Sequence, residues 1–509
     1  MRLPWTHRRA LLGVAVAIGV ALRVWSPSPL WLDEAQTVTF ARLPLGQLHD
    51  ALRLDGAPPL YYVLLHGWMD VLGGAGLGHG VLVVRSLSMV ASIAALPLAY
   101  LAGRRLGGSP RHGEVTLLVL AANPWAVRYA GEARMYSLVV LLVLVGILAV
   151  DALRRRGGRA PVLAVALVSA TLLYTHYWSI FLLGTAGLVL LARAARNPAE
   201  RPFARRAFAG LAAGGLFFLP WLPTFHYQST HTAAPWADPP NAASLARLPL
   251  DWAGGDGPAG ATLALFLVPL MLLAVFARRT NGGASTTSRR PGGPTAMLGL
   301  LTLGTLVVAL AASALGNGAV VGRYTAVVVP MVVLLVAFGV LTLPRAAAVP
   351  VLAGLVVLGM VGGLTIARTP HSQAGQVADI LNARARPGDL VVYCPDQLAP
   401  AVEARLAPDG GLDTLTVPRQ ADPHIVNWVD YTRRLGLNGP RVTAESVLGY
   451  LKGTETAVVW FVAGKNYRTH ENVCGPLRTR LAAAIGVPTV AFAGGGRSYE
   501  KATLERFAR

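Results

Sequence analysis

Apolar runs of about 20 residues, separated by short polar segments, fill the first two thirds of the chain. An α-helix rises 1.5 Å per residue, so a run of this length matches the hydrocarbon thickness of a bilayer. We therefore expect a polytopic α-helical membrane protein with about eleven transmembrane helices. The expected spans lie near residues 10–26, 82–103, 114–128, 135–152, 160–176, 178–194, 207–225, 259–277, 296–315, 325–343 and 347–367.

Composition agrees with this interpretation. Hydrophobic residues make up 54% of the chain and charged residues 14%, about half the charged share of a globular protein. The net charge of +20 would suit a nucleic-acid-binding protein. However, the basic residues fall in short clusters between apolar runs, which is typical of cytoplasmic loops. We expect a membrane protein without a nucleic-acid partner.

The arginine clusters predict the orientation of the chain. They occupy every second segment between expected spans, at Arg8–Arg9, Arg104–Arg105, Arg154–Arg156, Arg193, Arg205–Arg206, Arg278–Arg279, Arg289–Arg290 and Arg345. The intervening segments carry acidic residues instead, and positive charge favours the cytoplasmic side. We expect a multi-pass protein of the plasma membrane with a cytoplasmic N-terminus. The segment 27–80 and the C-terminal tail would then lie outside.

Residues 369–509 form a different kind of segment from the membrane part, 1–368. Strands are expected at 389–394 and 456–464, with helices at 376–385, 400–406 and 474–486. This alternation predicts an extracytoplasmic α/β domain with a largely parallel sheet. Its two cysteines, Cys394 and Cys474, could form a disulfide outside the cell. Two buried thiols are equally consistent with the sequence.

The polar segment 27–80 follows the first expected span and forms the first outer loop. Asp33 and Glu34 stand next to each other there, and Asp55, Tyr62 and His66 follow. Carboxylates beside a membrane cost several kcal/mol unless they are paired or functional. The alternative is a solvated loop with an interfacial belt of aromatic residues.

Further polar groups are expected at the outer ends of later spans. The turn between the third and fourth spans carries Arg128, Glu132, Arg134 and Tyr136, and the spacing of Glu132 and Tyr136 predicts one shared helical face. Two more groups follow, His176 with Tyr177 and Arg323 with Tyr324. Singly, such aromatic residues often anchor a helix at the interface, and arginines extend toward water. His176 alone could be a hydrogen-bonded residue at a helix end.

Together these groups fit one kind of chemistry. A carboxylate can accept a proton from a hydroxyl, and cations can hold a phosphate. The outer face of a membrane has no ATP or nucleotide sugar, so an activated sugar there would have to be carried on a lipid. Transfer from a polyprenyl-phosphate sugar requires one base and positive charge for the departing phosphate.

Five segments, in order along residues 1–345, carry a family resemblance. They are LWLDEA (30–35), GAPPLYYVLLHGW (56–68), RYAGEARMYSL (128–138), YTHYW (174–178) and GRYTAVVVP (322–330). The ordered set resembles the GT-C glycosyltransferases of the family 39 type, which include protein O-mannosyltransferases and aminoarabinose transferases. The C-terminal domain matches nothing comparable.

The resemblance implies an inverting transfer of a sugar from a polyprenyl-phosphate donor to a hydroxyl of a glycan, lipid or protein. It implies Asp33 as the catalytic base, with Glu34 supporting it or binding substrate, and basic residues that hold the lipid phosphate, here Arg134, Arg323 and Arg128. The remaining candidates for substrate binding are Asp55, Tyr62, His66, Glu132, Tyr136, His176, Tyr177 and Tyr324. Some members bind a divalent metal through Glu and His, which makes Glu132 and His176 weak candidates; the sequence is equally consistent with no cofactor.

Two other functions are compatible with a polytopic chain. One is a transporter or flippase of lipid-linked saccharides, and the other is a non-catalytic membrane subunit of cell-envelope assembly. Transporters place ionisable residues near the middle of the bilayer. Here the expected spans are nearly free of acidic residues and the polar groups gather at one face, which favours a transferase.

Overall fold

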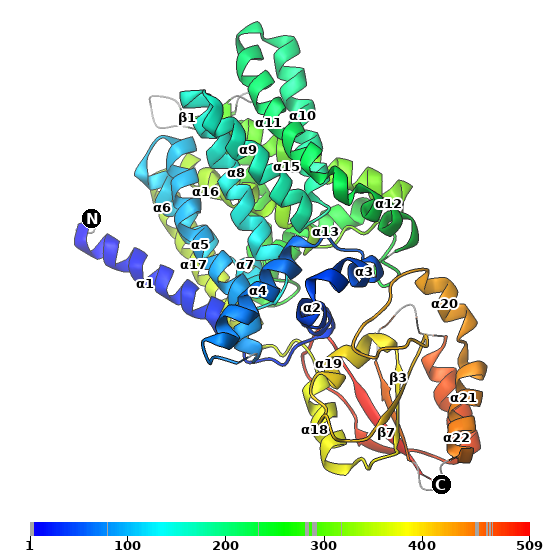
Figure 1. Ribbon diagram of the computed structural model, residues 1–509. Coiled ribbons are helices and arrows are strands. Elements are labelled where there is room, and N and C mark those ends of the chain that lie inside the picture. Colours follow the sequence, from blue (N-terminus) through cyan, green and yellow to red (C-terminus); the bar gives the residue numbers. More distant parts are fainter. Residues whose placement is uncertain are drawn as a thin grey trace.

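The computed structural model describes residues 5–78, 80–232, 234–279, 285–287, 293–316, 318–453, 458–464, 467, 470 and 472–508. The chain forms a helical part and a smaller C-terminal α/β part, which lie side by side in Figure 1 with α2 and α3 between them. The expected cytoplasmic residues Arg289–Arg290 lie outside the described residues.

A bundle of helices with an apolar core forms the larger part. Its elements are α1 (Trp5–Val24), α5 (Val81–Gly107), α6 (Pro110–Ala121), α7 (Pro124–Ala130), α8 (Tyr136–Arg156), α9 (Arg159–Thr175), α10 (Ser179–Arg196), α11 (Arg201–Phe218), α12 (Leu222–His231), α13 (Ala242–Trp252), α14 (Pro258–Phe276), α15 (Gly293–Leu315), η3 (Tyr324–Val327), α16 (Val329–Thr342) and α17 (Arg345–Arg368). Helix α16 is the most central element, because its residues from Val329 to Val340 are all buried.

Membrane-spanning helices are present, as the apolar runs predict. Among the described residues, seven helical segments are long and apolar enough to cross a bilayer. They are Val81–Gly107, Tyr136–Arg156, Ser179–Arg196, Pro198–His231, Pro258–Phe276, Gly293–Leu315 and Arg345–Arg368. Two further apolar helices, Arg159–Thr175 and Val329–Thr342, are shorter. The count of about eleven spans therefore stays a prediction.

Two segments differ from their expected form. The third expected span is broken at Asn123, whose side chain accepts a hydrogen bond from the Ala126 amide and so caps α7 after α6 has ended. The segment 27–80 contains three helices, α2 (Leu32–Arg42), α3 (Leu45–Asp55) and α4 (Leu60–Gly74). Gly56, at φ 82°, ends α3 in the left-handed conformation that glycine adopts without strain.

The C-terminal part is a three-layer α/β structure. Its five strands, β3 (Leu390–Cys394), β4 (Asp413–Thr416), β5 (Val459–Ala463), β6 (Thr489–Phe492) and β7 (Thr503–Phe507), have the order β4-β3-β5-β7-β6. Strand β3 pairs in parallel with β4 and β5, whereas β7 is antiparallel to β5 and β6. The sheet is therefore mixed rather than largely parallel.

Helices cover both faces of this sheet, because successive strand residues point to opposite sides. One face packs on α18 (Ala374–Arg384) and α19 (Ala399–Glu403), and the other on α21 (Pro440–Gly453) and α22 (Cys474–Ile485). The short helices η4 (Asp396–Leu398) and α20 (Tyr431–Leu437) complete the part. Cys394 and Cys474 are joined by a disulfide that ties the end of β3 to the start of α22.

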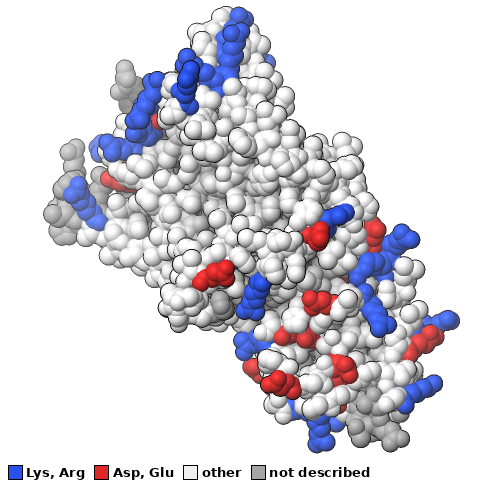
Figure 2. All heavy atoms as spheres, viewed as in Figure 1, with Lys and Arg blue, Asp and Glu red and all other residues white. Residues whose placement is uncertain are grey.

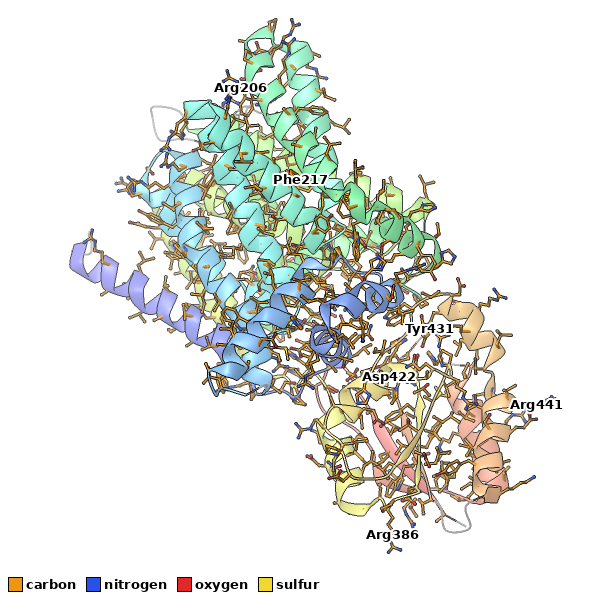
Figure 3. The ribbon with its side chains drawn as sticks, in the orientation of Figure 1. Arg206, Phe217, Arg386, Asp422, Tyr431 and Arg441 are labelled. Carbon is orange, nitrogen blue, oxygen red and sulfur yellow. A yellow bond between two sulfur atoms is a disulfide. The ribbon has the colours of Figure 1, made fainter. Side chains whose placement is uncertain are left out.

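The C-terminal part packs on α2, α3 and α12. Ala35 of α2 belongs to the same buried apolar cluster as residues of α18, α19 and β3. Backbone hydrogen bonds add to this contact, from the Trp428 amide to the Leu54 carbonyl at 2.8 Å and from the Asp430 amide to the His231 carbonyl at 2.9 Å. Tyr431 and Asp422 lie on the side of the C-terminal part that faces the bundle (Figure 3). The first turn of α2 is thereby enclosed between the two parts.

Candidate active site

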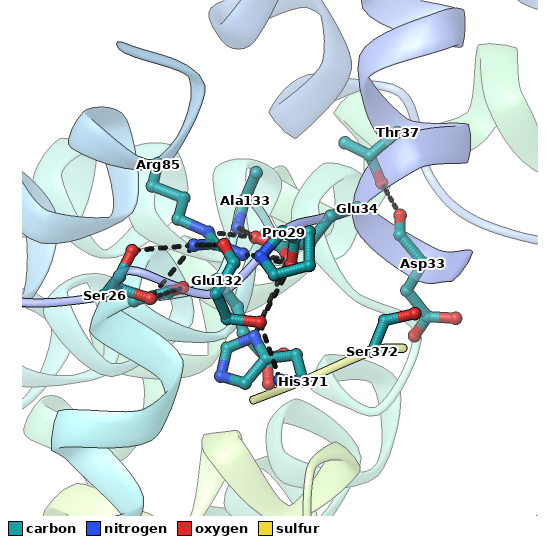
Figure 4. Close-up of polar contacts among 12 residues, drawn as sticks. Ser26, Pro29, Asp33, Glu34, Thr37, Arg85, Glu132, Ala133, His371 and Ser372 are labelled. Atoms are coloured by element: carbon teal, nitrogen blue, oxygen red, sulfur yellow. Dashed lines mark hydrogen bonds and ion pairs between the residues drawn. The ribbon is translucent and has the colours of Figure 1, made fainter. Parts of the chain in front are cut away.

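The candidate site is centred on the first turn of α2. Trp31 precedes the helix without capping it by its side chain, and Asp33 and Glu34 occupy its first turn. Negative charge is favourable there, since the helix N-terminus carries partial positive charge. Because neighbouring helix residues are rotated by about 100°, the two carboxylates point in different directions, as Figure 4 shows.

Glu34 points inward and is fully buried. Its carboxylate accepts hydrogen bonds from Arg85 Nε at 2.7 Å, Arg85 Nη2 at 2.6 Å and the Ala133 amide at 2.8 Å. His371 Nδ1 lies 3.7 Å from Glu34 Oε2. Burial by itself raises the pKa of Glu34, but the Arg85 guanidinium more than offsets this and lowers the pKa to about 2. Glu34 is thus a permanently charged anchor whose oxygens are engaged within the protein.

Asp33 points to the interface and remains accessible, with 17% of its side chain exposed. Its Oδ2 lies 4.0 Å from Arg134 Nε and 4.0 Å from Arg323 Nη1. At this distance the two guanidinium groups neutralise the carboxylate without forming close hydrogen bonds to it. The structure therefore brings together three of the predicted site residues, a carboxylate and two cations.

Several buried donors around Asp33 have no hydrogen-bond partner within the described part of the chain: Arg134 Nε, Arg323 Nε, Tyr136 Oη and Trp31 Nε1. Arg134 is held by its Nη1, which donates to Thr37 Oγ1 at 2.9 Å. Buried donors are satisfied in most proteins, so a cluster that is not satisfied suggests a missing polar ligand. Charged and neutral N–H and O–H donors on several sides suit an anion such as phosphate.

Arg323 is positioned by aromatic rings. Its guanidinium carbon lies 4.4 Å from the ring centre of Trp236, 5.6 Å from that of Tyr324 and 5.8 Å from that of Trp31. Such cation–π contacts orient the guanidinium and cost less desolvation than an aliphatic pocket would. Tyr324 thus belongs to the site through its contact with Arg323.

Asp55 and Tyr62 form a pair next to this site, and Arg134 Nη1 donates to Tyr62 Oη at 3.4 Å. Tyr62 Oη donates to Asp55 Oδ2 at 2.6 Å, and Gln36 Nε2 donates to Asp55 Oδ1 at 2.7 Å. Burial raises the pKa of Asp55. His66 faces elsewhere, because its Nδ1 contacts the Ala41 carbonyl at 2.8 Å and its Nε2 lies 3.4 Å from Asp70. All of these atoms have protein partners, so the pair supports α2 and α4.

The segment between α7 and α8 differs from its expected form. α7 ends at Ala130 and α8 begins at Tyr136, so Glu132 and Tyr136 do not share a helical face. The expected helical spacing is wrong because Gly131 ends α7 and the following residues form bends. Arg128 pairs with Glu132 through Nε and Oε1 at 3.0 Å, and its guanidinium carbon lies 3.8 Å from the ring centre of Tyr499.

The remaining candidates, His176 and Tyr177, face aromatic rings and polar partners. His176 packs against Tyr136 and Tyr324, and its Nδ1 accepts a hydrogen bond from the Trp178 amide at 3.2 Å. Tyr177 Oη accepts a hydrogen bond from Trp221 Nε1 at 2.8 Å and donates one to Gln228. Tyr177 is thereby directed away from Asp33 and toward α12.

Glu132 and His176 are the two residues that the sequence offers as metal ligands. Among the described residues, no group of three or more His, Cys, Asp or Glu side chains is placed to hold a metal ion. Glu132 is engaged by Arg128, and the His176 ring is held between Tyr136 and Tyr324. A divalent metal held by Glu132 and His176 stays a prediction.

Four contributors were missed in the sequence: Arg85, Trp236, His371 and Glu500. Arg85 could have been found, because a lone charge near the start of an apolar span needs a buried partner. His371 and Glu500 come from the C-terminal part, for which no motif was available. Glu500 accepts hydrogen bonds from the Leu32 amide at 3.4 Å and from Ser372 Oγ, and burial raises its pKa to about 8.

No protein-family model matches the chain, and no curated protein sequence matches it. Solved structures do match it over nearly its whole length. The structure of ArnT from Cupriavidus metallidurans bound to undecaprenyl phosphate has a TM-score of 0.59 at 13% identity, covering 99% of this chain and 98% of that one. The apo state of the same protein has a TM-score of 0.57 at 14% identity and covers 98% of each chain.

A third similar structure is the arabinofuranosyltransferase AftD from Mycobacteria, with a TM-score of 0.47 at 12% identity, covering 98% of this chain and 41% of that one.

The similarity to ArnT extends through both the helical and the α/β parts, since the two chains cover each other almost completely. The chain therefore has the fold of the GT-C glycosyltransferases, as its sequence motifs predict.

Proposed function

We propose that the protein is a membrane glycosyltransferase that moves a sugar from a polyprenyl-phosphate donor to an acceptor hydroxyl at the outer face of the membrane. One observation carries the proposal. Asp33 Oδ2 lies 4.0 Å from both Arg134 and Arg323, and the buried Nε atoms of these two partly buried arginines have no hydrogen-bond partner among the described residues. A base and an incomplete anion site are thus adjacent.

The reaction follows from these groups. The acceptor oxygen attacks the anomeric carbon on the side opposite the phosphate, and its proton passes to the Asp33 carboxylate. The bond between the anomeric carbon and the phosphate oxygen breaks, and polyprenyl phosphate leaves with the electron pair. Arg134 and Arg323 stabilise the charge that develops on it. A single displacement of this kind inverts the anomeric centre.

The donor phosphate also affects Asp33 in this scheme. Without the donor phosphate, the Asp33 carboxylate is the nearest anion to Arg134 and Arg323. A phosphate placed on their free Nε atoms would share that positive charge and leave Asp33 as the available proton acceptor. Glu34 takes no proton in this scheme, because Arg85 holds it in the charged form and both of its oxygens are engaged.

The location at the outer face has independent support. The Cys394–Cys474 disulfide lies in the part that packs on α2, and disulfides persist in oxidising compartments. Basic side chains gather at the opposite end of the bundle in Figure 2. Both features agree with a cytoplasmic arginine-rich end and a site on the other side.

The proposal is tested with Asp33→Asn and a control in the same segment, Asp50→Asn. The Asp50 side chain is exposed and contacts the neighbouring His49. Membranes with each variant are supplied with polyprenyl-phosphate sugars of several kinds and an envelope extract as acceptor. We expect Asp33→Asn to lose transfer by a factor of at least about 10³, while Asp50→Asn keeps it and both variants melt like the parent protein. Unchanged transfer by Asp33→Asn would refute the assignment.

A further inference from the structure

A large apolar cavity lies inside the helical bundle, at the end opposite to Asp33. Its volume is about 570 Å³, and it is bordered by α8, α9, α10, α11 and α15 and open to the outside. The deeper wall is mainly aliphatic, with Val143, Leu172, Leu182, Leu298, Leu301 and Met331 among its residues, and the hydroxyl of Ser169 also lines it. Protein interiors contain few voids larger than a water molecule, so a cavity of this size is expected to hold an apolar guest.

The mouth of the cavity is lined by arginines. Arg105 lies in the last turn of α5, Arg154 and Arg155 in the last turn of α8, and Arg193 in the last turn of α10. These ends lie together near the labelled Arg206 in Figure 3, and blue side chains cover the same region in Figure 2. The cavity therefore combines an aliphatic interior with a cationic opening.

Part of this positive charge is already neutralised. Arg155 pairs with Asp151 at 2.8 Å, while Arg154 and Arg193 share Glu200 at 2.6 and 3.8 Å. Among the described residues at the mouth, four arginines thus face two carboxylates. Two positive charges remain for a ligand, and the half-exposed guanidinium groups can still reach it.

We propose that this cavity binds an anionic phospholipid of the cytoplasmic leaflet, with one acyl chain inside the bundle and the phosphate at the arginines. The volume falls within the range that proteins use for small molecules. An acyl chain fits the aliphatic wall, since each buried methylene contributes about 0.8 kcal/mol. Basic pockets between transmembrane helices on the cytoplasmic side recognise anionic headgroups.

The position of the cavity separates this lipid from the donor of the proposed reaction. The donor phosphate would lie at Arg134 and Arg323, at the other end of the bundle from Arg105 and Arg193. A phosphate at the arginine mouth could not reach Asp33. The site is therefore a lipid site in its own right, and it would hold α10 and α15 against α8 and α9.

Two substitutions and a matched control test the proposal. The double variant Arg105→Gln/Arg193→Gln removes two positive charges, which is the excess of arginines over carboxylates at the mouth. The variant Ala186→Trp places a large side chain from α10 in the cavity and fills it. The control is Arg104→Gln, which is exposed on the same helix as Arg105 and does not line the cavity. Each protein is placed in nanodiscs of phosphatidylcholine alone or of phosphatidylcholine with phosphatidylglycerol. Thermal unfolding is then measured, and the lipids that stay bound are identified by native mass spectrometry.

We expect the parent protein and Arg104→Gln to retain phosphatidylglycerol and to gain several degrees in Tm from it. The arginine double variant should lose both effects, and Ala186→Trp should lose the bound lipid while melting at least as high as the parent. Equal retention of phosphatidylcholine and phosphatidylglycerol would refute the proposal, as would unchanged retention by the double variant. Displacement of the lipid by added polyprenyl phosphate would also refute it, because the cavity would then belong to the donor.

Discussion

The buried Arg85–Glu34 pair allows a quantitative prediction about what holds the site together. Arg85 donates two hydrogen bonds to Glu34, and its remaining N–H groups donate to the carbonyl oxygens of Ser26, Ser28 and Pro29 at 2.8–3.1 Å. Both side chains are fully buried. Substituting Arg85→Met leaves the Glu34 charge without its cation and three carbonyls without a donor.

Breaking a buried ion pair from one side costs about 3–5 kcal/mol. A chain of this size shifts in Tm by roughly 2 °C per kcal/mol, so Arg85→Met should lower Tm by about 6–10 °C in detergent. Sugar transfer should fall as well, because Asp33 is the neighbour of Glu34 on α2. The matched control is Arg104→Met on the same helix, where an exposed charge is removed at a cost of less than about 1 kcal/mol.

The double variant Glu34→Leu/Arg85→Met separates the two contributions. Without either charge, the penalty of an unpaired carboxylate disappears, and only the unsatisfied carbonyls and the Ala133 amide remain. The double variant should therefore melt above Arg85→Met and below the parent protein. If Arg85→Met melts within a degree or two of the parent, or if the double variant melts lower than the single one, then Glu34 is not held as a buried charge and the reasoning fails.

Three further predictions concern the site and its surroundings. Arg134→Ala should weaken the use of the polyprenyl donor, raising its KM at least tenfold and leaving the KM of the acceptor unchanged; an equal effect on both substrates would contradict a phosphate role. The pKa of Glu500 is about 8 in the folded protein and about 4.3 in the unfolded chain. At pH values between these two, folding is coupled to the uptake of a proton by Glu500, so stability should fall as the pH rises from 4.3 to 8. Thermal melts across this window should show the slope, and Glu500→Gln should make it shallower without removing it, because burial also raises the pKa of Asp396 to about 8; a slope that is unchanged in the variant would assign it to groups other than Glu500. Finally, a cysteine at the exposed Asp409 should react with an impermeant thiol reagent in intact cells, and labelling only after lysis would reverse the predicted orientation.

The helical part could be predicted well because its signal is local. Long apolar runs specify helices wherever they fold, and the motifs around Asp33, Arg134 and Arg323 place polar residues at one end of them. The close approach of these three residues depends on how α2, the turn before α8 and η3 pack, which no spacing in the sequence describes. The expectation that Glu132 and Tyr136 share a helical face was wrong for a related reason. The i, i+4 spacing holds only within one continuous helix, and α7 ends before Gly131.

The contribution of the C-terminal part could not be predicted for a different reason. His371 and Glu500 approach α2 from positions more than 300 residues away, and no motif marks them. Arg85 is the instructive exception. It is a single charge in an otherwise apolar run, and the cost of burying it predicts a carboxylate partner even though the sequence does not say which one.

The two adjacent acids of α2 illustrate how one helical turn can separate support from chemistry. Glu34 is held by three hydrogen bonds at 2.6–2.8 Å and is inaccessible, so it can neither take a proton nor reach a substrate. Asp33 is rotated by about 100° from it, stays partly exposed and lies beyond hydrogen-bonding distance of both arginines. A base must be free to accept a proton, and a phosphate site must have donors to spare. Only the Asp33 side of the helix meets both conditions. The rigid Glu34–Arg85 pair on the other side fixes the orientation of α2, and this orientation directs Asp33 toward Arg134 and Arg323.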